Sequence, residues 1–233
     1  RKYNVTVEIE EPRIAYRETI TRPSEARGRH KKQSGGRGQF GDCSIRLTPR
    51  PRGEGYEFVN SIKGGVIPGK YVPSVDRGIR EAAERGILAG YPLIDFAAEV
   101  NDGSYHAVDS SDIAFKIAAS QAFQAAAKAA EPRLLEPVME VEVVTPEACM
   151  GDIMGDISGR RGRVLGMESA DGRATIRAVV PEAELYRYAS SIRAMTQGRG
   201  HHARRFAGYE VMPEQEARGV IKARDERSTT AEV

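Results

Sequence analysis

Residues 138–157 read VMEVEVVTPEACMGDIMGDI, and two different periodicities follow each other within this stretch. Apolar and acidic residues alternate from Val138 to Val144, which predicts a β-strand with one buried face. Thr145 and Pro146 then form a typical helix start, because threonine can cap the first turn and proline fits the first helical position. A helix is predicted to follow, because four apolar residues recur at helical spacing: Met150, Ile153, Met154 and Ile157.

The residues that follow continue this alternation of strands and helices. Two strands are predicted at about 163–168 and 174–180, joined by the turn Ala170-Asp171-Gly172. A second helical stripe consists of Leu185, Tyr188, Ala189 and Ile192, and a last strand is predicted at about 202–211. The order β-α-β-β-α-β is that of a ferredoxin-like domain, in which two helices cover one antiparallel sheet. The polar tail from Pro213 is predicted to form a short helix followed by disorder.

A second set of elements lies before residue 132. Strands are predicted at 14–20, 43–47, 56–62 and 94–100, and Asn101-Asp102-Gly103 is predicted to be a tight turn. One helix is predicted between a Ser74 cap and Gly86, and a longer, alanine-rich helix over about 110–130 is predicted to be capped by Asp109. Pro132 marks a boundary. The sequence therefore predicts an α+β chain of two domains, 1–131 and 132–233, each a two-layer α/β sandwich.

Residues 22–40 differ in composition from everything around them. They contain six cations against the single acid Glu25, together with four glycines and almost no apolar side chains; the cations are Arg22, Arg27, Arg29, Lys31, Lys32 and Arg37. This composition predicts a long exposed loop between two strands, and such long loops are usually functional.

The overall composition excludes several classes of protein. The 233 residues carry 35 basic and 33 acidic side chains, so a formal charge of +2 argues against a polycation. Hydrophobic residues make up 40%, which suffices for packed cores, and no run is long enough to span a membrane. Cys43 and Cys149 match no metal or redox spacing and are expected to be reduced thiols of a cytoplasmic protein. The chain begins at Arg1 without a methionine, which suggests a fragment.

Two glycine patterns come close to known phosphate-binding motifs. Gly36-x-Gly38-x-x-Gly41 is followed by a predicted strand, whereas a dinucleotide site requires a helix there. Gly64-x-x-x-x-Gly69-Lys70 is followed by Tyr71, whereas a P-loop requires serine or threonine for Mg²⁺. No catalytic constellation and no metal-ligand cluster is predicted. An enzyme that binds a phosphorylated ligand through Gly64–Lys70 remains an alternative.

The chemistry of residues 22–40 favours a nucleic-acid partner. Lysine and arginine side chains gain free energy at a phosphate backbone through counterion release, and glutamine and serine can donate to bases or 2′-hydroxyls. Composition alone leaves a merely solvated loop equally open. A second basic segment at 197–205, QGRGHHARR, shifts the balance toward an RNA-binding protein. A stand-alone RNA-binding module remains a further alternative.

Several motifs resemble one known family. Residues 15–20 (AYRETI) and 32–41 (KQSGGRGQFG) resemble the start of the fourth domain of elongation factor G. Residues 64–68 (GGVIP), 102–106 (DGSYH) and 108–111 (VDSS) continue the resemblance in the same order. Residues 146–152 and 160–162 resemble the fifth domain, and the similarity reaches to about Pro213.

The resemblance implies a ribosomal translocase whose GTP- and Mg²⁺-binding domain would lie upstream, with no cofactor in this chain. It also implies a left-handed βαβ crossover in the first domain and a ferredoxin-like second domain. The implied partners are tRNA, mRNA, the decoding region of the small ribosomal subunit and large-subunit ribosomal RNA, and not a membrane. The residues implied to contact the codon–anticodon duplex are Lys31, Lys32, Gln33, Ser34, Gly35, Gly36, Arg37, Gly38, Gln39 and His106. Those implied to contact large-subunit RNA are Arg199, Gly200 and His201.

The chain also departs from the family pattern. After Gly200, the run His201-His202-Ala203-Arg204-Arg205 replaces an aromatic–Thr–Met run, and Gly208-Tyr209-Glu210 replaces His-Tyr-Glu. Gly69 replaces a residue that is often lysine. These departures suggest a paralogue devoted to ribosome recycling as an alternative to translocation.

Overall fold

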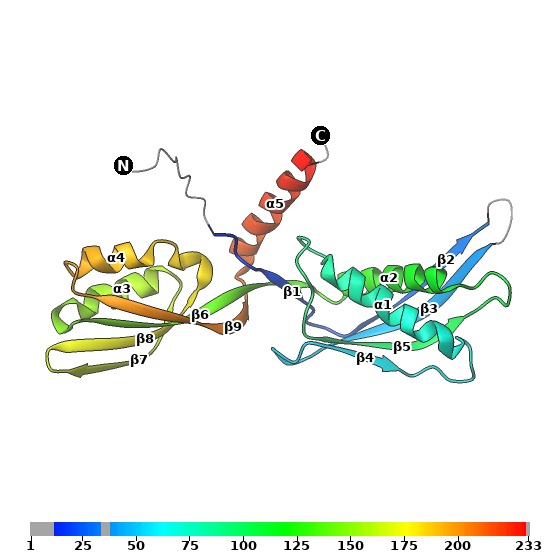
Figure 1. Cartoon of the computed structure of the whole chain (residues 1–233), viewed down its shortest axis with the longest axis horizontal. Helices are drawn as coiled ribbons and strands as arrows, with labels where there is room; N and C mark the ends of the chain where they lie inside the picture. Colours follow the sequence, from blue (N-terminus) through cyan, green and yellow to red (C-terminus); the bar gives the residue numbers. More distant parts are fainter. Residues whose placement is uncertain (1–11, 34–37, 232–233) are drawn as a thin grey trace, which may run out of the picture. The chain divides into compact units, whose positions relative to one another are not determined.

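The computed structural model describes residues 12–33 and 38–231 and divides the chain into two compact units (Figure 1). One unit holds residues 16–135 together with the C-terminal segment from residue 211, and the other holds residues 136–210 together with the described residues before 16. The sequence predicted domains 1–131 and 132–233, so the two divisions differ by four residues at the junction, in the tail and in the residues before 16. The tail forms helix α5 (Glu214–Ala231), and Met212 before it donates its N–H to the carbonyl of Leu134.

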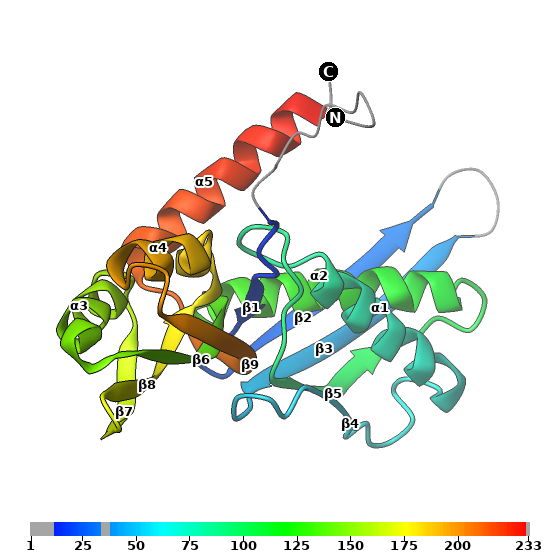
Figure 2. The ribbon, with the colours of Figure 1, turned by 60° about the vertical axis from the view of Figure 1, so that its left-hand side comes forward.

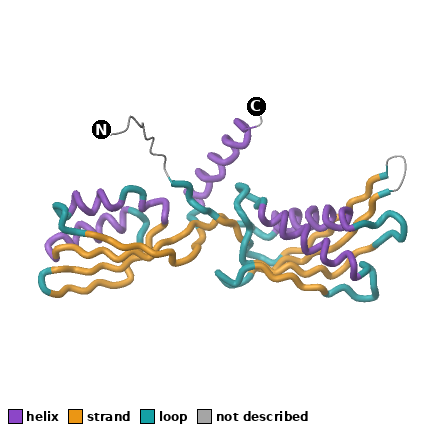
Figure 3. Tube along the Cα trace, in the orientation of Figure 1, coloured by secondary structure: helices purple, strands orange, loops and turns teal. Residues whose placement is uncertain are grey.

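The unit 16–135 is built on a four-stranded sheet covered on one face by two helices (Figures 1 and 3). The strand order is β2-β3-β5-β4, with β2 at Ser24–Lys32, β3 at Gln39–Pro49, β4 at Tyr56–Asn60 and β5 at Phe96–Ser104. Strands β4 and β5 are parallel and connected through the short helix η1 (Gly69–Tyr71) and α1 (Val72–Glu84). The second helix is α2 (Asp112–Ala129). This is the βαβ crossover implied by the resemblance, and its left-handedness stays a prediction.

The helix starts differ from the predicted ones. Helix α2 is capped by Ser111, whose side chain accepts from the N–H of Ala114 at 3.2 Å, and not by Asp109. Asp109 lies before the cap and contacts other segments. Helix α1 starts at Val72 with a proline in its first turn, two residues before the predicted cap Ser74. Ser74 instead donates to the Asp112 carboxylate at 2.6 Å.

The predicted loop 22–40 is wrong for most of its length, because Ser24–Lys32 forms strand β2, which is paired with β3 along its whole length. The side chains of Glu25, Arg27, Arg29 and Lys31 are exposed, whereas the alternate position Gly28 is buried against α2. A Cβ at Gly28 would lie 2.0 Å from the carbonyl oxygen of Ala118. The buried face of this strand carries small residues in place of large apolar ones, so it lacks the usual strand pattern.

Two other strand limits also differ from expectation. Asn101, Asp102 and Gly103 lie within β5, where a register shift opposite Ser44/Ile45 accommodates them, and do not form a turn. Of the predicted strand 14–20, only β1 (Arg17–Thr19) is extended in a sheet, where it pairs with residues 133–135.

The unit 136–210 has the predicted order β-α-β-β-α-β. Its strands are β6 (Arg133–Pro146), β7 (Arg163–Ala170), β8 (Arg173–Pro181) and β9 (His201–Val211), and β6 pairs with both β8 and β9. Helix α3 (Met150–Gly159) follows the short helix η2 (Glu147–Cys149), and α4 (Tyr188–Met195) follows η3 (Glu182–Leu185). The core between sheet and helices consists of Val141, Val143, Ile153, Ile157, Ile176, Ala178, Val180, Leu185, Tyr188 and Ile192.

The first unit has its own core, in which alanines and aromatic rings alternate. Helix α2 buries Phe115 and Phe123 together with a series of alanines, which allow the helix to approach the sheet closely. Tyr71 stacks on Phe115, and Phe96 packs against Phe123. None of the helices in the described parts of the chain is long and apolar enough to cross a membrane.

Candidate nucleic-acid interface

A cavity of about 340 Å³ lies where strands β2 and β3 meet the loop between β5 and α2. Figure 2 shows these two strands running side by side. The lining residues come from three segments of the chain: Arg29, Lys31, Lys32 and Gln33; Gly38, Gln39 and Phe40; and His106 and Asp109. The structure therefore brings together six of the predicted contact residues and adds Arg29, Phe40 and Asp109. Ser34, Gly35, Gly36 and Arg37 lie outside the described residues.

Backbone hydrogen bonds hold the loop against the start of β3. The N–H of Phe40 donates to the carbonyl oxygen of Asp109 at 2.9 Å, and Phe40 forms an isolated bridge with Ser110. Ser110 also accepts from the N–H of His106 through its hydroxyl at 2.9 Å. Tyr71 donates to the Ser110 carbonyl at 3.1 Å from below. The loop is thus anchored to the unit's core through a buried tyrosine.

Gln39 and His106 present polar atoms at this cavity. The amide oxygen of Gln39 lies 2.8 Å from Nε2 of His30, so the Gln39 NH₂ group remains available to donate. The side chain of His106 is 55% exposed, and its ring lies 6.4 Å from that of Phe40. His30 was not among the predicted contact residues. Its period-two spacing from Lys32 would have indicated that the two side chains share a strand face.

The cations on strands β2 and β3 and on the loop after β3 divide into two groups. Those toward the middle and the far end of the sheet pair with carboxylates: Arg27 with Asp42 and Asp102, Arg46 with Glu25 and Glu99, and Arg50 and Arg52 with Glu54, Glu57 and Asp95. Within the described ranges, Arg29, Lys31 and Lys32 have no carboxylate at ion-pair distance. Positive potential is therefore concentrated at the cavity, where it can attract an anionic ligand.

Arg27 shows how thoroughly the paired cations are neutralised. Its guanidinium donates to both oxygens of the buried Asp42 carboxylate at 2.8 Å, and this contact holds the pKa of Asp42 below its ordinary value of 3.8. Two residues along the same strand, Arg29 instead lies 5.4 Å from the centre of the Phe40 ring. A guanidinium stacked on an aromatic ring keeps its N–H groups free for phosphate.

The second predicted contact lies at the start of β9. Gln197 and Gly198 both have positive φ, and the Thr196 hydroxyl accepts from the N–H of Gly200 at 2.8 Å. Among the residues that the structure describes, the guanidinium of Arg199 makes only long contacts of 3.4 and 3.5 Å to the oxygens of Thr196 and Gln197. His201 is exposed, whereas His202 packs edge-on against Tyr188, and burial lowers the pKa of His202 below 6.5. The three predicted residues thus form one exposed basic turn.

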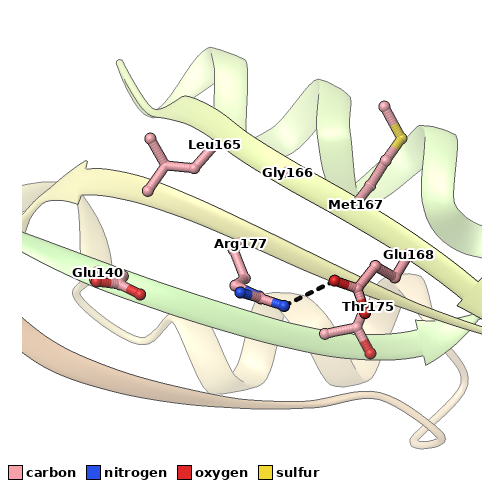
Figure 4. A pocket seen from close by; sticks show the side chains of 7 residues that line it. All are labelled: Glu140, Leu165, Gly166, Met167, Glu168, Thr175 and Arg177. Atoms are coloured by element: carbon pink, nitrogen blue, oxygen red, sulfur yellow. Dashed lines mark hydrogen bonds and ion pairs between the residues drawn. The ribbon is translucent and has the colours of Figure 1, made fainter.

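A further hollow of about 220 Å³ lies on the open face of the sheet in unit 136–210 (Figure 4). Its only cation, among the residues that line it, is Arg177, which donates to Glu168 at 2.8 Å and lies 3.8 Å from Glu142. Two carboxylates, Glu140 and Glu168, line the hollow against this one cation, so it does not favour an anionic ligand.

The two glycine patterns serve structural roles in the described residues. Gly41 lies in β3, where a Cβ would come within 2.3 Å of the Ala114 carbonyl oxygen. Gly64 and Gly65 form a turn with positive φ, and Lys70 in η1 lies over the ring of Tyr71 at 4.9 Å. A three-residue helix offers no phosphate cradle, and no cluster of metal-ligating side chains occurs in the ranges that the structure covers.

Comparison with known proteins identifies the family. Residues 12–131 match the family described as elongation factor G, domain IV, and residues 133–220 match elongation factor G C-terminus. The chain belongs to the elongation factor G family.

Individual relatives agree with this assignment. An elongation factor G-like protein from Thermotoga maritima is 53% identical over 223 residues, which cover 95% of this chain and 33% of the relative. Elongation factor G from Aquifex pyrophilus is 49% identical over 224 residues, covering 96% and 32%. A crystal structure of a protein from Thermus thermophilus superposes with a TM-score of 0.85 at 43% identity and covers 94% of this chain and 33% of that one. The chain spans about a third of the length of these relatives.

These similarities confirm the resemblance and the fold class predicted from the sequence. The chain matches domain IV and the C-terminal domain of the elongation factor G family of translation factors.

Proposed function

We propose that this chain is the ribosome-contacting part of a translational GTPase that promotes GTP-dependent movement of tRNA and mRNA through the ribosome. The cavity end of the unit 16–135 contacts the codon–anticodon duplex in the decoding region of the small subunit. The turn Arg199-Gly200-His201 contacts large-subunit ribosomal RNA. One observation carries the proposal: within the described residues, the cations of this sheet that lack a carboxylate partner gather at the same end as the exposed donors of Gln39 and His106.

The chemistry of the cavity suits a ligand recognised by its backbone. Arg29, Lys31 and Lys32 neutralise phosphates, and these contacts carry no sequence information. The NH₂ group of Gln39 and the ring of His106 can bond phosphate or 2′-hydroxyl oxygens, which every codon presents. A factor that serves all codons requires this kind of recognition. The proposed partners place the protein in the cytoplasm.

GTP and Mg²⁺ bind outside this chain in the proposed function. The Gly64–Lys70 segment does not fit a nucleotide, because Tyr71 follows it where a metal-binding hydroxyl is required and its lysine lies on an aromatic ring. The contribution of this chain is to bind and hold RNA.

The test is to replace Gln39 and His106 with alanine together in the complete factor. Translocation, followed by the rate of mRNA movement, should slow about tenfold or more, since a lost hydrogen bond of about 1.4 kcal/mol in a transition state corresponds to tenfold in rate. The rate of GTP hydrolysis should stay within about twofold, because the proposed contacts do not involve GTP. Arg80→Ala, which removes an exposed helix cation paired with Asp76, is the control. Wild-type translocation in the double variant would refute the proposal.

Ribosome recycling is the second candidate, and the replacement of the family's aromatic–Thr–Met run by residues 201–205 favours it. The same factor is assayed for splitting of post-termination ribosomes. Splitting without translocation by the wild-type factor would assign recycling in place of translocation.

A further inference from the structure

Asp109 is the residue at which the two sides of the cavity meet. Its Oδ1 accepts from the N–H of Gly38 at 3.1 Å, and its Oδ2 lies 3.3 Å from Nδ1 of His106. Its own carbonyl accepts from the N–H of Phe40, so two contacts from this residue join the start of β3 to the β5–α2 loop, and the contact with His106 lies within the loop. The Asp109 side chain is 30% exposed, which keeps these contacts partly shielded from water.

These contacts leave only one ring nitrogen of His106 toward solvent. Nδ1 lies 3.3 Å from the N–H nitrogen of Val108 and 3.2 Å from that of Asp109, in addition to the carboxylate. Nε2 takes part in no hydrogen bond with the described part of the chain. The two backbone N–H groups directed at Nδ1 favour the neutral tautomer that carries its proton on Nε2, which presents an N–H outward. The other neutral tautomer, in which Nδ1–H donates to Asp109, would present Nε2 outward as an acceptor.

A carboxylate is unexpected beside a site for RNA. The charged groups that face His106 across the cavity are Arg29, Lys31 and Lys32 from β2 and Asp109 from its own loop. The Asp109 charge opposes the three cations and repels phosphate, so its electrostatic effect alone weakens binding. Its presence is explained if the contacts that it makes contribute more than its charge costs.

We propose that Asp109 is a positioning residue, which holds Gly38 and His106 as one rigid surface and directs Nε2–H of His106 at a phosphate or ribose oxygen. This inference rests on the proposed function, because it assumes that the cavity binds RNA. It goes beyond the proposed function because it names the residue that organises the surface and the atom that donates to RNA.

Two variants test the contacts of Asp109 with Gly38 and His106 in different ways. Asp109→Asn removes the charge at nearly constant size. Gly38→Ala keeps the charge but displaces the carboxylate, because the new Cβ would lie 2.9–3.1 Å from the atoms of the Asp109 carboxyl group. The control is Asp112→Asn, which makes the same charge change three residues along the chain, at a carboxylate that bonds Ser74 and not the cavity. The probe is a small ribosomal subunit that carries mRNA and tRNA.

If Asp109 positions Gly38 and His106 (the clamp), its loss should weaken binding, whereas if it acts only as an opposing charge, its loss should strengthen binding. The clamp predicts that Asp109→Asn and Gly38→Ala bind the subunit about three- to tenfold more weakly, whereas Asp112→Asn binds equally or more tightly. Nitrogen NMR of the His106 ring should show a fixed proton distribution in the wild-type chain and an averaged one in both cavity variants. Backbone NMR spectra establish that each variant is folded.

Two results would overturn the inference. Binding by Asp109→Asn as tight as that of Asp112→Asn would show that Asp109 acts only as an opposing charge. Unchanged His106 ring signals in both cavity variants would show that Asp109 does not hold the imidazole, whatever happens to affinity. If the wild-type chain does not bind the subunit, the proposed function fails together with the RNA-directed part of this inference, and the ring signals still decide whether Asp109 positions His106.

Discussion

Gly28 determines how closely strand β2 can approach helix α2. A Cβ there would lie 2.0 Å from the carbonyl oxygen of Ala118 and 2.5 Å from the backbone nitrogen of Ala122. Both neighbours are backbone atoms of a buried helix, so they cannot move aside as a flexible side chain could. The position of the cations on the outer face of β2 therefore depends on Gly28, because only a residue without a side chain lets the inner face of β2 pack against α2.

We expect Gly28→Ala to lower the free energy of unfolding by about 1–3 kcal/mol, the usual cost of forcing extra atoms into a packed core. Denaturant unfolding followed by circular dichroism measures this change. Gly69→Ala is the matched control, because a Cβ at Gly69 meets no atom within 4 Å and the residue has no positive φ. Equal stabilities of the two variants would contradict the close contact.

Among the elements, the β2–β3 pair shows how one ladder can carry two kinds of cation. Arg27 and Arg29 point to the same outer face, two residues apart, and differ in what their side chains contact, because each reaches diagonally across the ladder. Arg27 meets the buried Asp42, while Arg29 meets Phe40. The first arginine stabilises the sheet, and the second remains available to a ligand.

The Arg27–Asp42 pair predicts a pH dependence of stability. Because Arg27 lowers the pKa of Asp42 in the folded state, the unfolded chain binds more protons around and below pH 3.8, and the stabilisation is lost as pH falls through the folded pKa. We expect Arg27→Met to lower the free energy of unfolding by about 1–3 kcal/mol at neutral pH, because it leaves a buried carboxylate without its main partner. The difference from wild type should shrink as the pH falls below 3.8.

Unfolding titrations between neutral pH and acid measure this difference. Asp102→Asn removes only the exposed partner of Arg27, so the free energy of unfolding of this variant should stay close to that of the wild type at each pH. A difference between wild type and Arg27→Met that does not change with pH would contradict the assignment.

For the molecule as a whole, the formal charge of +2 conceals an uneven distribution. Arg27, Arg46 and Arg52 pair with carboxylates, so among the described residues the cations of this sheet that lack a carboxylate partner lie at its cavity end. Association with RNA should therefore depend on a few local cations and not on net charge.

This distribution predicts which cations set the salt dependence of RNA binding. Lys31→Gln should lower the slope of log affinity against log salt by about 0.7–0.9, the value for one phosphate contact. Arg46→Gln should leave the slope nearly unchanged, because Arg46 already pairs with Glu25 and Glu99. The slopes are obtained by measuring the affinity of the chain for a tRNA anticodon stem–loop at KCl concentrations between about 50 and 200 mM. Equal reductions in both variants would refute the distinction.

Much of the fold follows from local pattern. The period-two run at 138–144, the Thr145-Pro146 helix start and the two apolar stripes predict the β-α-β-β-α-β order, because a half-buried strand and an amphipathic helix show their periods within a few residues. Strand β2 could not be predicted in this way. Its buried face is formed by small residues such as Gly28, because a helix backbone lies directly against it, and that neighbour is 90 residues away in the sequence.

The residues of the cavity could be predicted from the sequence to different degrees. Gln39 and His106 could be predicted from motifs that resemble those of the family, and the excess of cations at 22–40 is visible in the composition. Which cations remain without a carboxylate was decided only by tertiary structure, since Asp42 lies 15 residues from Arg27 in the sequence and Asp102 lies 75 away. The same holds for Asp109, which reads as a helix cap in sequence but contacts Gly38, 71 residues earlier. Hydrogen bonds and ion pairs depend on distances of about 3 Å between atoms, and only the folded chain brings such distant residues that close.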